Sequence, residues 1–285
     1  VNMTYDQEKF FLFSMHELGY YDTTASIDYI LNVTGHKNLI TIGHSMGTTN
    51  VIIATSVRPE YEKKIKLSIL FAPGVYANHL LVGGLAEIFY NTWFRWLNVY
   101  HEESYLAKGS TMLGIVDAMC SPSSISRNLC FSGLGMISGV GSNQTVEDSV
   151  MKMVSKFPAG TSFNVLKQQI QAFRTGDFKP LNYGRKGNME RYGLFEPAPY
   201  PIGIANTPTA IYYGCCNDFL SHAKDSLKLS RRLKNVVKLY PVPYKKFNHG
   251  DFLWAKDAYQ LLYKDVLVLI DQYTPWQLRS NMTIM

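Results

Sequence analysis

The chain of 285 residues is 46% hydrophobic and 18% charged, and its formal net charge is +6 at pH 7. This composition excludes a disordered protein, and the length fits one large domain or a domain with a sizeable insertion. The lysine and arginine residues are scattered along the sequence, so the positive charge does not indicate a nucleic-acid partner. No run of about 20 uncharged apolar residues is present, which argues against a membrane-spanning helix.

The first predicted elements are a helix followed by a strand. Residues 22–34 place apolar side chains at helical spacing, with Asp22 as the N-cap and Gly35 as the stop. The next run, NLITIG at 38–43, has the β-branched and apolar residues of a short strand that is buried on both faces. Such a strand is typical of a parallel sheet.

The strand leads directly into a G-x-S-x-G motif. Its residues are Gly43, His44, Ser45, Met46 and Gly47. The run that follows the serine, MGTTNVIIATS, continues at helical spacing. The motif alone is a weak signal, but between a strand and a helix it predicts a nucleophile elbow, in which a sharp turn presents the serine.

Further strands and helices alternate later in the chain. Strands are predicted at 66–73, 207–214 and 236–242, and a helix at 221–233 lies between the last two. Residues 252–273 repeat at 3.6 and form a predicted closing amphipathic helix. This order predicts an α/β fold with a parallel sheet.

The strand rhythm stops between Pro73 and Pro208, where aromatic and apolar stretches take its place. An insertion at the carboxyl end of a parallel strand lies where α/β proteins bind their ligands. We therefore predict a cap over the active site; the alternative is a helical subdomain with its own core. The expected organisation is a first core part at 1–77, the cap at 78–205 and a second core part at 206–285.

A serine nucleophile needs a histidine base and a carboxylate that orients the histidine. In the elbow order, the acid and then the histidine follow the serine. Asp218 and His249 follow two successive predicted strands, so Ser45, Asp218 and His249 form a candidate triad. The alternatives are that Asp218 caps the next helix and that Asp225 is the acid, whereas Asp251 is expected to start the last helix.

The other histidines are expected to lie outside the chemistry. His44 adjoins Ser45, but an elbow directs the serine into the site and its neighbour elsewhere. The rest are interpreted as surface or structural residues: His16, His36, His79, His101 and His222.

Cysteines and glycosylation sequons indicate an oxidising compartment. Cys120 and Cys130 enclose a short polar loop and are a candidate disulfide. Cys215 and Cys216 are adjacent, and neighbouring cysteines rarely bridge each other without strain. Neither pair has the spacing of a zinc site. The sequons lie at Asn2, Asn32, Asn143 and Asn281, of which the last three are the glycosylation candidates.

Several spaced motifs resemble those of the acid lipases, which include lysosomal acid lipase and gastric lipase. They are FSMHELGYYDTTASIDYIL leading into GHSMGTT, FPAGTS after the Cys120 and Cys130 pair, and YYGCCNDFLSHAKD followed by YKKFNHGDFLWAKDA. The resemblance covers essentially the whole chain. It implies an α/β-hydrolase fold with a helical cap, hydrolysis of triacylglycerols or steryl esters, no metal or cofactor, and glycosylation with delivery to lysosomes or secretion.

The resemblance also implies a mechanism and a partner. His249 takes the proton of Ser45 as the hydroxyl attacks an ester carbonyl, and Asp218 stabilises the imidazolium. The backbone N–H of Met46 is implied as one oxyanion donor. The implied partner is a lipid ester at a lipid-droplet or membrane interface, without nucleic acid, and the sequence does not indicate the oligomeric state.

Departures from the family pattern bear on activity. Cys215 and Cys216 replace a common Gly-Gly pair and are expected to crowd the loop of Asp218, and Met46 replaces a frequent glutamine. Residues 1–44 contain no His-Gly oxyanion loop, and the opening VNMTYDQEKFF lacks the regions of a signal peptide. We therefore interpret the chain as beginning within a longer protein, with an exposed sheet edge. The alternative is a catalytically inactive lipid- or partner-binding protein on the hydrolase scaffold.

Overall fold

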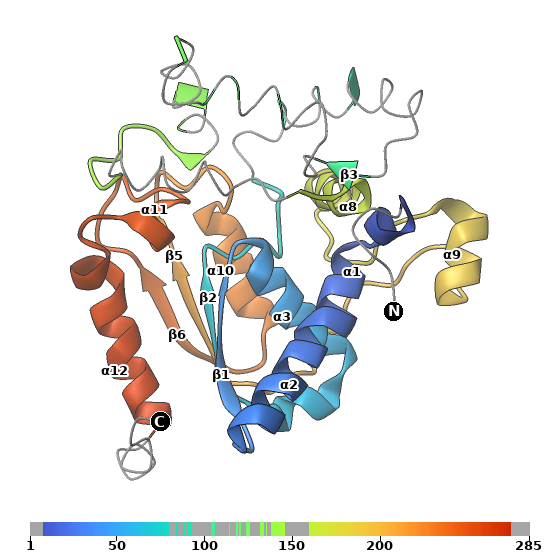
Figure 1. The fold of residues 1–285 in the computed structure, drawn as a ribbon, viewed down its shortest axis with the longest axis horizontal. Coiled ribbons are helices and arrows are strands. Elements are labelled where there is room, and N and C mark those ends of the chain that lie inside the picture. Colours follow the sequence, from blue (N-terminus) through green and yellow to red (C-terminus); the bar gives the residue numbers. More distant parts are fainter. Residues whose placement is uncertain are drawn as a thin grey trace.

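A computed structural model describes residues 8–79, 138–145 and 160–274, together with scattered positions between these ranges. A parallel sheet lies at the centre of the fold (Figure 1). Its strand order is β1 (Leu39–His44), β2 (Ile65–Phe71), β5 (Thr209–Tyr213) and β6 (Val236–Pro241). The four strands lie where the short apolar runs predict them, so the prediction of an α/β fold with a parallel sheet is confirmed.

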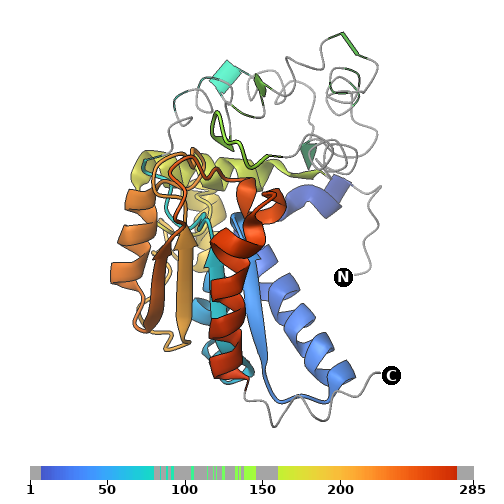
Figure 2. The ribbon, with the colours of Figure 1, turned by 90° about the vertical axis from the view of Figure 1, so that its left-hand side faces the viewer.

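Helices cover both faces of this sheet, as Figures 1 and 2 show. On one face lies α12 (Lys264–Tyr273), and on the other lie α3 (Met46–Val57) and α10 (Ala223–Arg232). Because successive side chains of a strand point to opposite faces, each strand contributes to both layers of the core. The first layer joins Leu67, Ile69 and Phe71 to Val266 and Leu269, and the second joins Leu70 and Ile211 to Ile52, Ile53 and Leu229.

The N-terminal helix begins earlier than predicted. Its segments are α1 (Met15–Glu17), the π-helical turn η2 (Leu18–Thr23) and α2 (Thr24–Thr34), after the 3-10 segment η1 (Glu8–Leu12). Ser14 is the N-cap, and its backbone N–H donates to Glu17 Oε2 at 2.6 Å in a capping box. Asp22 therefore lies inside the helix and is not its N-cap. The helix ends at Gly35, where φ is 69°, as predicted.

The predicted closing helix at 252–273 is interrupted. The observed segments are α11 (Asp251–Trp254), the π-helical turn η4 (Tyr259–Tyr263) and α12. After α11 the backbone of Ala255 is extended, with ψ of 136°, and it forms an isolated antiparallel bridge with Thr145. Residues 251–273 contain neither proline nor glycine. A contact with a distant segment therefore accompanies a break that no local residue signals.

Within the predicted cap, the structure describes few elements. These are α8 (Phe163–Thr175), α9 (Gly184–Tyr192), and the short antiparallel strands β3 (Ser104–Tyr105) and β4 (Thr161–Ser162). The aromatic stretch HLLVGGLAEIFYNTWFRWL lies mostly outside the described residues, so the cap over the site stays a prediction. Among the helices of the described ranges, none has both the length and the hydrophobicity to cross a membrane.

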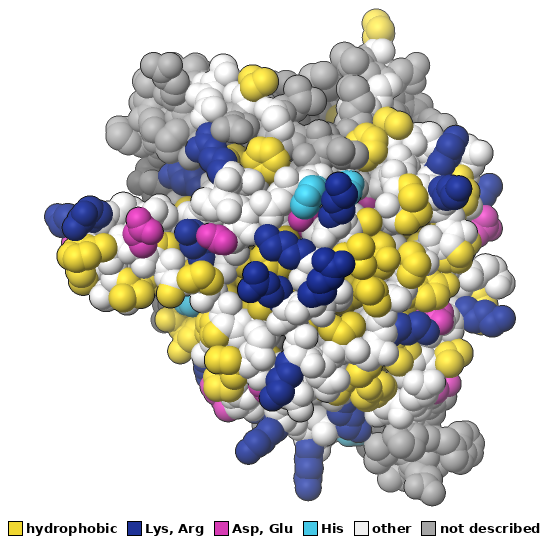
Figure 3. All heavy atoms as spheres, turned by 180° about the vertical axis from the view of Figure 1, so that it is seen from behind, with side chains coloured by type: hydrophobic (Ala, Val, Ile, Leu, Met, Phe, Trp, Pro, Cys, Tyr) yellow, Lys and Arg dark blue, Asp and Glu magenta, His cyan; other side chains and the backbone are white. Residues whose placement is uncertain are grey.

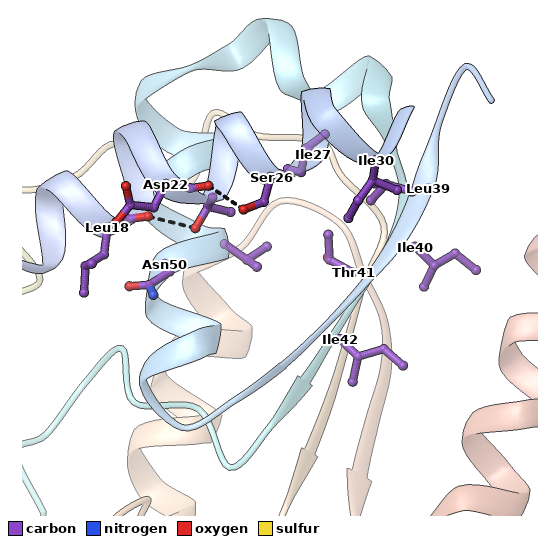
Figure 4. A pocket seen from close by; sticks show the side chains of 12 residues that line it. Leu18, Asp22, Ser26, Ile27, Ile30, Leu39, Ile40, Thr41, Ile42 and Asn50 are labelled. Atoms are coloured by element: carbon purple, nitrogen blue, oxygen red, sulfur yellow. Dashed lines mark hydrogen bonds between the residues drawn. The ribbon is translucent and has the colours of Figure 1, made fainter. Parts of the chain in front are cut away.

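An open groove follows the edge of the sheet along β1. It has a volume of about 380 Å³ and lies between α2, β1 and the first turns of α3 (Figure 4). Ile42 of β1 lines this groove and is 54% exposed. None of the candidate triad residues lines it. In the described residues β1 is thus an unpaired edge strand, the kind of edge that promotes association between chains.

Basic side chains that are scattered in the sequence gather on one face of the fold. Figure 3 shows lysine and arginine near the centre of the face that lies behind the sheet in Figure 1. Helix α10 carries four of the basic residues: Lys224, Lys228, Arg231 and Arg232. Lys228 also has a structural role, because its Nζ donates to Asn78 Oδ1 at 3.0 Å and to the Gly176 carbonyl at 2.8 Å.

Candidate active site

Ser45 stands at a sharp turn between β1 and α3. Its φ is 53° and its ψ is −121°, and among the described non-glycine residues only Ala72 also has a positive φ. Such a conformation costs about 1–3 kcal/mol, so its surroundings must hold it. The Ser45 N–H donates to the Phe71 carbonyl at 3.0 Å, and the Ser45 carbonyl accepts from Thr48 Oγ1 at 2.6 Å. A strand, a strained serine and a helix follow one another as the motif predicts.

The two glycines of the motif have different surroundings. A β-carbon at Gly43 would lie 2.8 Å from the Gly47 carbonyl carbon and 2.8 Å from the Thr48 nitrogen. A β-carbon at Gly47 would meet nothing within 4 Å among the described residues. Gly43 therefore lets the end of β1 pass close to the first turn of α3, whereas no described contact requires a glycine at 47.

Asp218 and His249 lie beyond the carboxyl ends of the neighbouring strands β5 and β6. His249 Nδ1 is 3.0 Å from Asp218 Oδ1 and 3.2 Å from Asp218 Oδ2. Both residues are buried, with exposed fractions of 3% for Asp218 and 7% for His249. The backbone N–H groups of Leu220 and Ser221 donate to Asp218 Oδ1 at 3.1 and 2.8 Å. The carboxylate is thus held in place, and Nε2 is the ring nitrogen left to exchange a proton with a hydroxyl.

The rival carboxylates have other partners. Asp225 accepts from the backbone N–H of His79 at 2.9 Å and lies 2.8 Å from His79 Nδ1. Asp251 is the first residue of α11 and accepts from the backbone N–H of Asn248 at 2.9 Å. The structure therefore brings Asp218, and not Asp225 or Asp251, against the ring of His249, which is the acid–histidine half of the candidate triad.

His44 does not pack away from the site, so that prediction was wrong. Its Nε2 is 2.9 Å from the carbonyl oxygen of His249, and the two rings are 4.7 Å apart. Because a carbonyl oxygen only accepts, His44 carries its proton on Nε2. Burial, and after it the neighbouring ring of His249, lower the pKa of His44 to about 4, against the opposing effect of the hydrogen bond to the His249 carbonyl. His44, the residue before Ser45, is thus neutral and links the turn of Ser45 to the loop that carries His249.

Titration of His44 is expected to make the protein less stable as the pH falls from about 6.5 to about 4. In an unfolded chain histidine has a pKa of about 6.5, whereas folded His44 has a pKa of about 4. Between these two pH values the unfolded state therefore binds more protons than the folded state. The stability linked to neutral His44 is fully present only above a pH of about 6.5. The two pKa values correspond to a loss of about 2 kcal/mol between neutral pH and pH 5.

Urea unfolding at pH 7 and pH 5 measures this loss. Glutamine at position 44 retains an N–H donor for the His249 carbonyl but does not titrate. Between pH 7 and pH 5, the free energy of unfolding of His44→Gln is therefore expected to fall by about 2 kcal/mol less than that of the wild type. The exposed His36 supplies the control, and His36→Gln is expected to keep the pH dependence of the wild type. An unchanged pH dependence in His44→Gln would refute the role of His44.

The adjacent cysteines form a disulfide, contrary to the expectation that such neighbours rarely bridge. Cys215 is half-buried and Cys216 is exposed, at the start of the loop that follows β5. The bridge does not displace the carboxylate of Asp218 from His249. The crowding predicted for this loop therefore leaves the pairing of acid and histidine intact.

The other predicted residues have varied positions. Met46 is the first residue of α3, so its N–H is one of the amides without a partner inside the helix. Cys120 is in a disulfide, and its predicted partner Cys130 lies outside the described residues. Asn32 and Asn143 are exposed, and Asn281 also lies outside the described residues. Within the described part of the chain, no group of three metal-ligating side chains could hold a metal ion.

The chain is similar to lipases over nearly its whole length. Lipase 1 of Drosophila melanogaster is 33% identical over 266 residues, which cover 93% of this chain and 58% of that protein. A candidate lysosomal acid lipase/cholesteryl ester hydrolase of Crotalus adamanteus is 30% identical over 271 residues, or 95% of this chain and 66% of that protein. The chain belongs to the acid lipase family. It spans about three fifths to two thirds of the length of these two relatives.

Solved structures agree with this family at the level of the fold. A candidate lipase from Sulfolobus solfataricus gives a TM-score of 0.55 at 13% identity, covering 90% of this chain and 67% of that chain. No model of a known protein family matches the chain. The chain therefore has the α/β-hydrolase fold. Its residues Ser45, Asp218 and His249 lie at the carboxyl ends of the strands.

Proposed function

We propose that this chain is a serine hydrolase that cleaves carboxylic esters of lipids, triacylglycerols or steryl esters, through an acyl-enzyme. The observation that carries the proposal is the pairing of buried Asp218 with His249 at the sheet edge where Ser45 occupies a positive-φ turn. A serine hydroxyl becomes a nucleophile at neutral or acidic pH only beside a base that is itself oriented. Membership of the acid lipase family supports a lipid ester as the substrate.

The proposed reaction follows from these three side chains. His249 Nε2 takes the proton of Ser45 as the hydroxyl oxygen attacks the ester carbonyl, and Asp218 stabilises the imidazolium. The imidazolium returns the proton to the leaving alcohol, and the acyl group stays on Ser45. The same histidine then takes a proton from a water molecule as the water oxygen attacks the acyl carbon. It returns that proton to Ser45 Oγ as the bond to the acyl group breaks and the fatty acid leaves. The N–H of Met46 is the proposed oxyanion donor, and loss of one such donor typically costs about 100- to 1000-fold in rate.

The proposal extends to an acidic, oxidising location, either the lysosome or a secreted fluid. His44 has a pKa of about 4, so its hydrogen bond to the histidine loop persists at a pH of about 5. The disulfide of Cys215 and Cys216 and the exposed sequon residues Asn32 and Asn143 suit an oxidising, glycosylating pathway. The proposed site of action is the surface of a lipid droplet or membrane, where such esters collect.

Covalent labelling of the 285-residue chain by a fluorophosphonate probe tests the proposal. Intact mass is expected to show one adduct on the wild type and none on Ser45→Ala. Ser26 lies exposed on α2, so Ser26→Ala is the control and is expected to keep the adduct. Folded wild-type protein without an adduct would instead support an inactive lipid- or partner-binding protein on the same scaffold. Labelled protein would then be assayed with triacylglycerol and steryl ester to separate the two substrate classes.

A further inference from the structure

A short segment at 138–145, which we call the clamp segment, lies across the loop that carries His249. The Ser138 carbonyl accepts from the backbone N–H of His249 at 3.0 Å. The next carbonyl, that of Gly139, accepts from Asn248 Nδ2 at 3.3 Å. Two successive carbonyls of the clamp segment therefore hold the proposed base and the residue before it.

The clamp segment also holds the loop of the proposed acid. The Val140 carbonyl accepts from Asn217 Nδ2 at 3.1 Å, and the same Nδ2 donates to the Lys246 carbonyl in the histidine loop at 2.7 Å. The packing at this crossing is close, because a β-carbon at Gly139 would lie 1.9 Å from the Asn217 carbonyl oxygen. The side-chain amide of Asn217, the residue before Asp218, thus joins the clamp segment to the acid loop and the histidine loop.

Asp251 anchors the far end of the clamp segment. This residue has no exposed surface, and its carboxylate accepts from Ser142 Oγ at 2.5 Å and from Thr145 Oγ1 at 3.2 Å. It also accepts from the backbone N–H of Asn248 at 2.9 Å. A buried carboxylate is tolerated only when donors surround it, so the two hydroxyls determine where Asp251 can lie. Asp251 in turn determines where the amide of Asn248 can lie.

Other contacts keep the clamp segment attached if the hydroxyls are lost. Gln144 accepts from the Lys256 N–H through its carbonyl at 2.9 Å and from the Asp257 N–H through Oε1 at 3.0 Å. Its Nε2 donates to Asp257 Oδ2 at 3.0 Å. Variants at the two hydroxyls are therefore expected to fold, with a looser histidine loop.

We propose that Ser142, Thr145 and Asp251 are positioning residues, which hold His249 against Asp218 through the clamp segment. The inference rests on the proposed function of the triad. Each of the three acts through another group, since the hydroxyls bind Asp251 and Asp251 binds the residue that precedes His249. A misplacement of about 1 Å at a reacting group costs up to about 100-fold in rate, so a loosened loop lowers the rate of proton transfer.

The test must separate the hydroxyl of Thr145 from the sequon that it completes with Asn143. The double variant Ser142→Ala/Thr145→Val removes both hydroxyl donors and the sequon. Asn143→Gln removes the sequon and keeps both donors, and Thr145→Ser keeps the donor and the sequon. The last two are therefore the matched controls, and all variants are compared in the full 285-residue chain.

Two measurements are made on each variant. In ester hydrolysis we expect the double variant to lose about 10- to 100-fold in kcat with KM within about twofold, because proton transfer is impaired and substrate contacts are kept. Fluorophosphonate labelling is expected to slow by the same factor, and both controls should stay within about twofold of the wild type. In hydrogen exchange, residues 245–257 are expected to take up deuterium faster in the double variant alone.

The outcomes separate this inference from the proposed function. Unchanged deuterium uptake in the double variant overturns the clamp, whatever the activity. A loss in kcat that Asn143→Gln shares also overturns it, since the glycan would then be the cause. A wild type that takes up no probe counts against Ser45 as the nucleophile, while faster exchange in the double variant would still support the clamp.

Discussion

Asp218→Asn is expected to lower kcat by about 10,000-fold, the magnitude typical of removing the charge of a triad acid. Asp218 Oδ1 accepts the N–H groups of Leu220 and Ser221, and an asparagine would keep its amide oxygen on these two donors. Its amide nitrogen would then take the place of Oδ2, which lies 3.2 Å from His249 Nδ1. The variant would lose the negative charge that stabilises the imidazolium, and its N–H group would favour the tautomer in which Nδ1 accepts and the ring proton lies on Nε2. A histidine protonated on Nε2 cannot take the proton of Ser45.

The rival acid provides the control for this substitution. Asp225 is as buried as Asp218, with exposed fractions of 2% and 3%, but its carboxylate binds His79. Asp225→Asn is therefore expected to lower stability and to leave kcat within a few fold of the wild type. Steady-state hydrolysis of a soluble ester and circular dichroism of both variants make the comparison. A larger loss of kcat in Asp225→Asn than in Asp218→Asn would show that the acid is assigned wrongly.

Gly43→Ala is expected to destabilise the protein by about 3 kcal/mol, at the upper end of the usual cost of overpacking. The added β-carbon would lie 2.8 Å from two backbone atoms of the first turn of α3, at Gly47 and Thr48. Backbone atoms cannot rotate away as a flexible side chain can, so β1 and α3 must move apart. That movement displaces the turn that carries Ser45, and fluorophosphonate labelling is expected to slow with the loss of stability.

Gly47→Ala is the matched control, in the same motif and only four residues away. A β-carbon there meets no described atom within 4 Å, so its free energy of unfolding is expected to stay within about 0.5 kcal/mol of the wild type. Urea unfolding of the two variants gives the difference directly. Equal losses of stability in both would mean that the close approach of β1 to α3 is not what requires a glycine at position 43.

Much of the sheet could be predicted from local sequence, because a strand buried on both faces has a continuous apolar run that few other structures require. The buried strands β2 and β5 are examples. The prediction that NLITIG at 38–43 is buried on both faces was wrong, because β1 lies at the edge of the described sheet and exposes Ile42. The start of the first helix could also be predicted from the sequence, because Ser14 and Glu17 have the spacing of a capping box. The prediction of Asp22 as the N-cap was wrong, since Asp22 lies inside the helix.

The candidate site was predictable only in part. Ser45, Asp218 and His249 could be placed from their order and from the strand ends that they follow, since parallel strands bring their carboxyl ends to one edge. The contact of His44 with the His249 carbonyl could not, because the two residues are 205 positions apart in the chain. The break at Ala255 likewise depends on a partner more than 100 residues earlier, at Thr145.

The sequence by itself determined the family, the parallel sheet and the candidate triad, because apolar periodicity and spaced motifs are local properties of the chain. Only the tertiary structure decided that Asp218 rather than Asp225 meets His249, that His44 is half-buried and neutral, and that residues 138–145 hold both loops of the site. These outcomes depend on hydrogen bonds and burial between distant segments. A linear pattern records which groups exist, and the fold decides which of them meet.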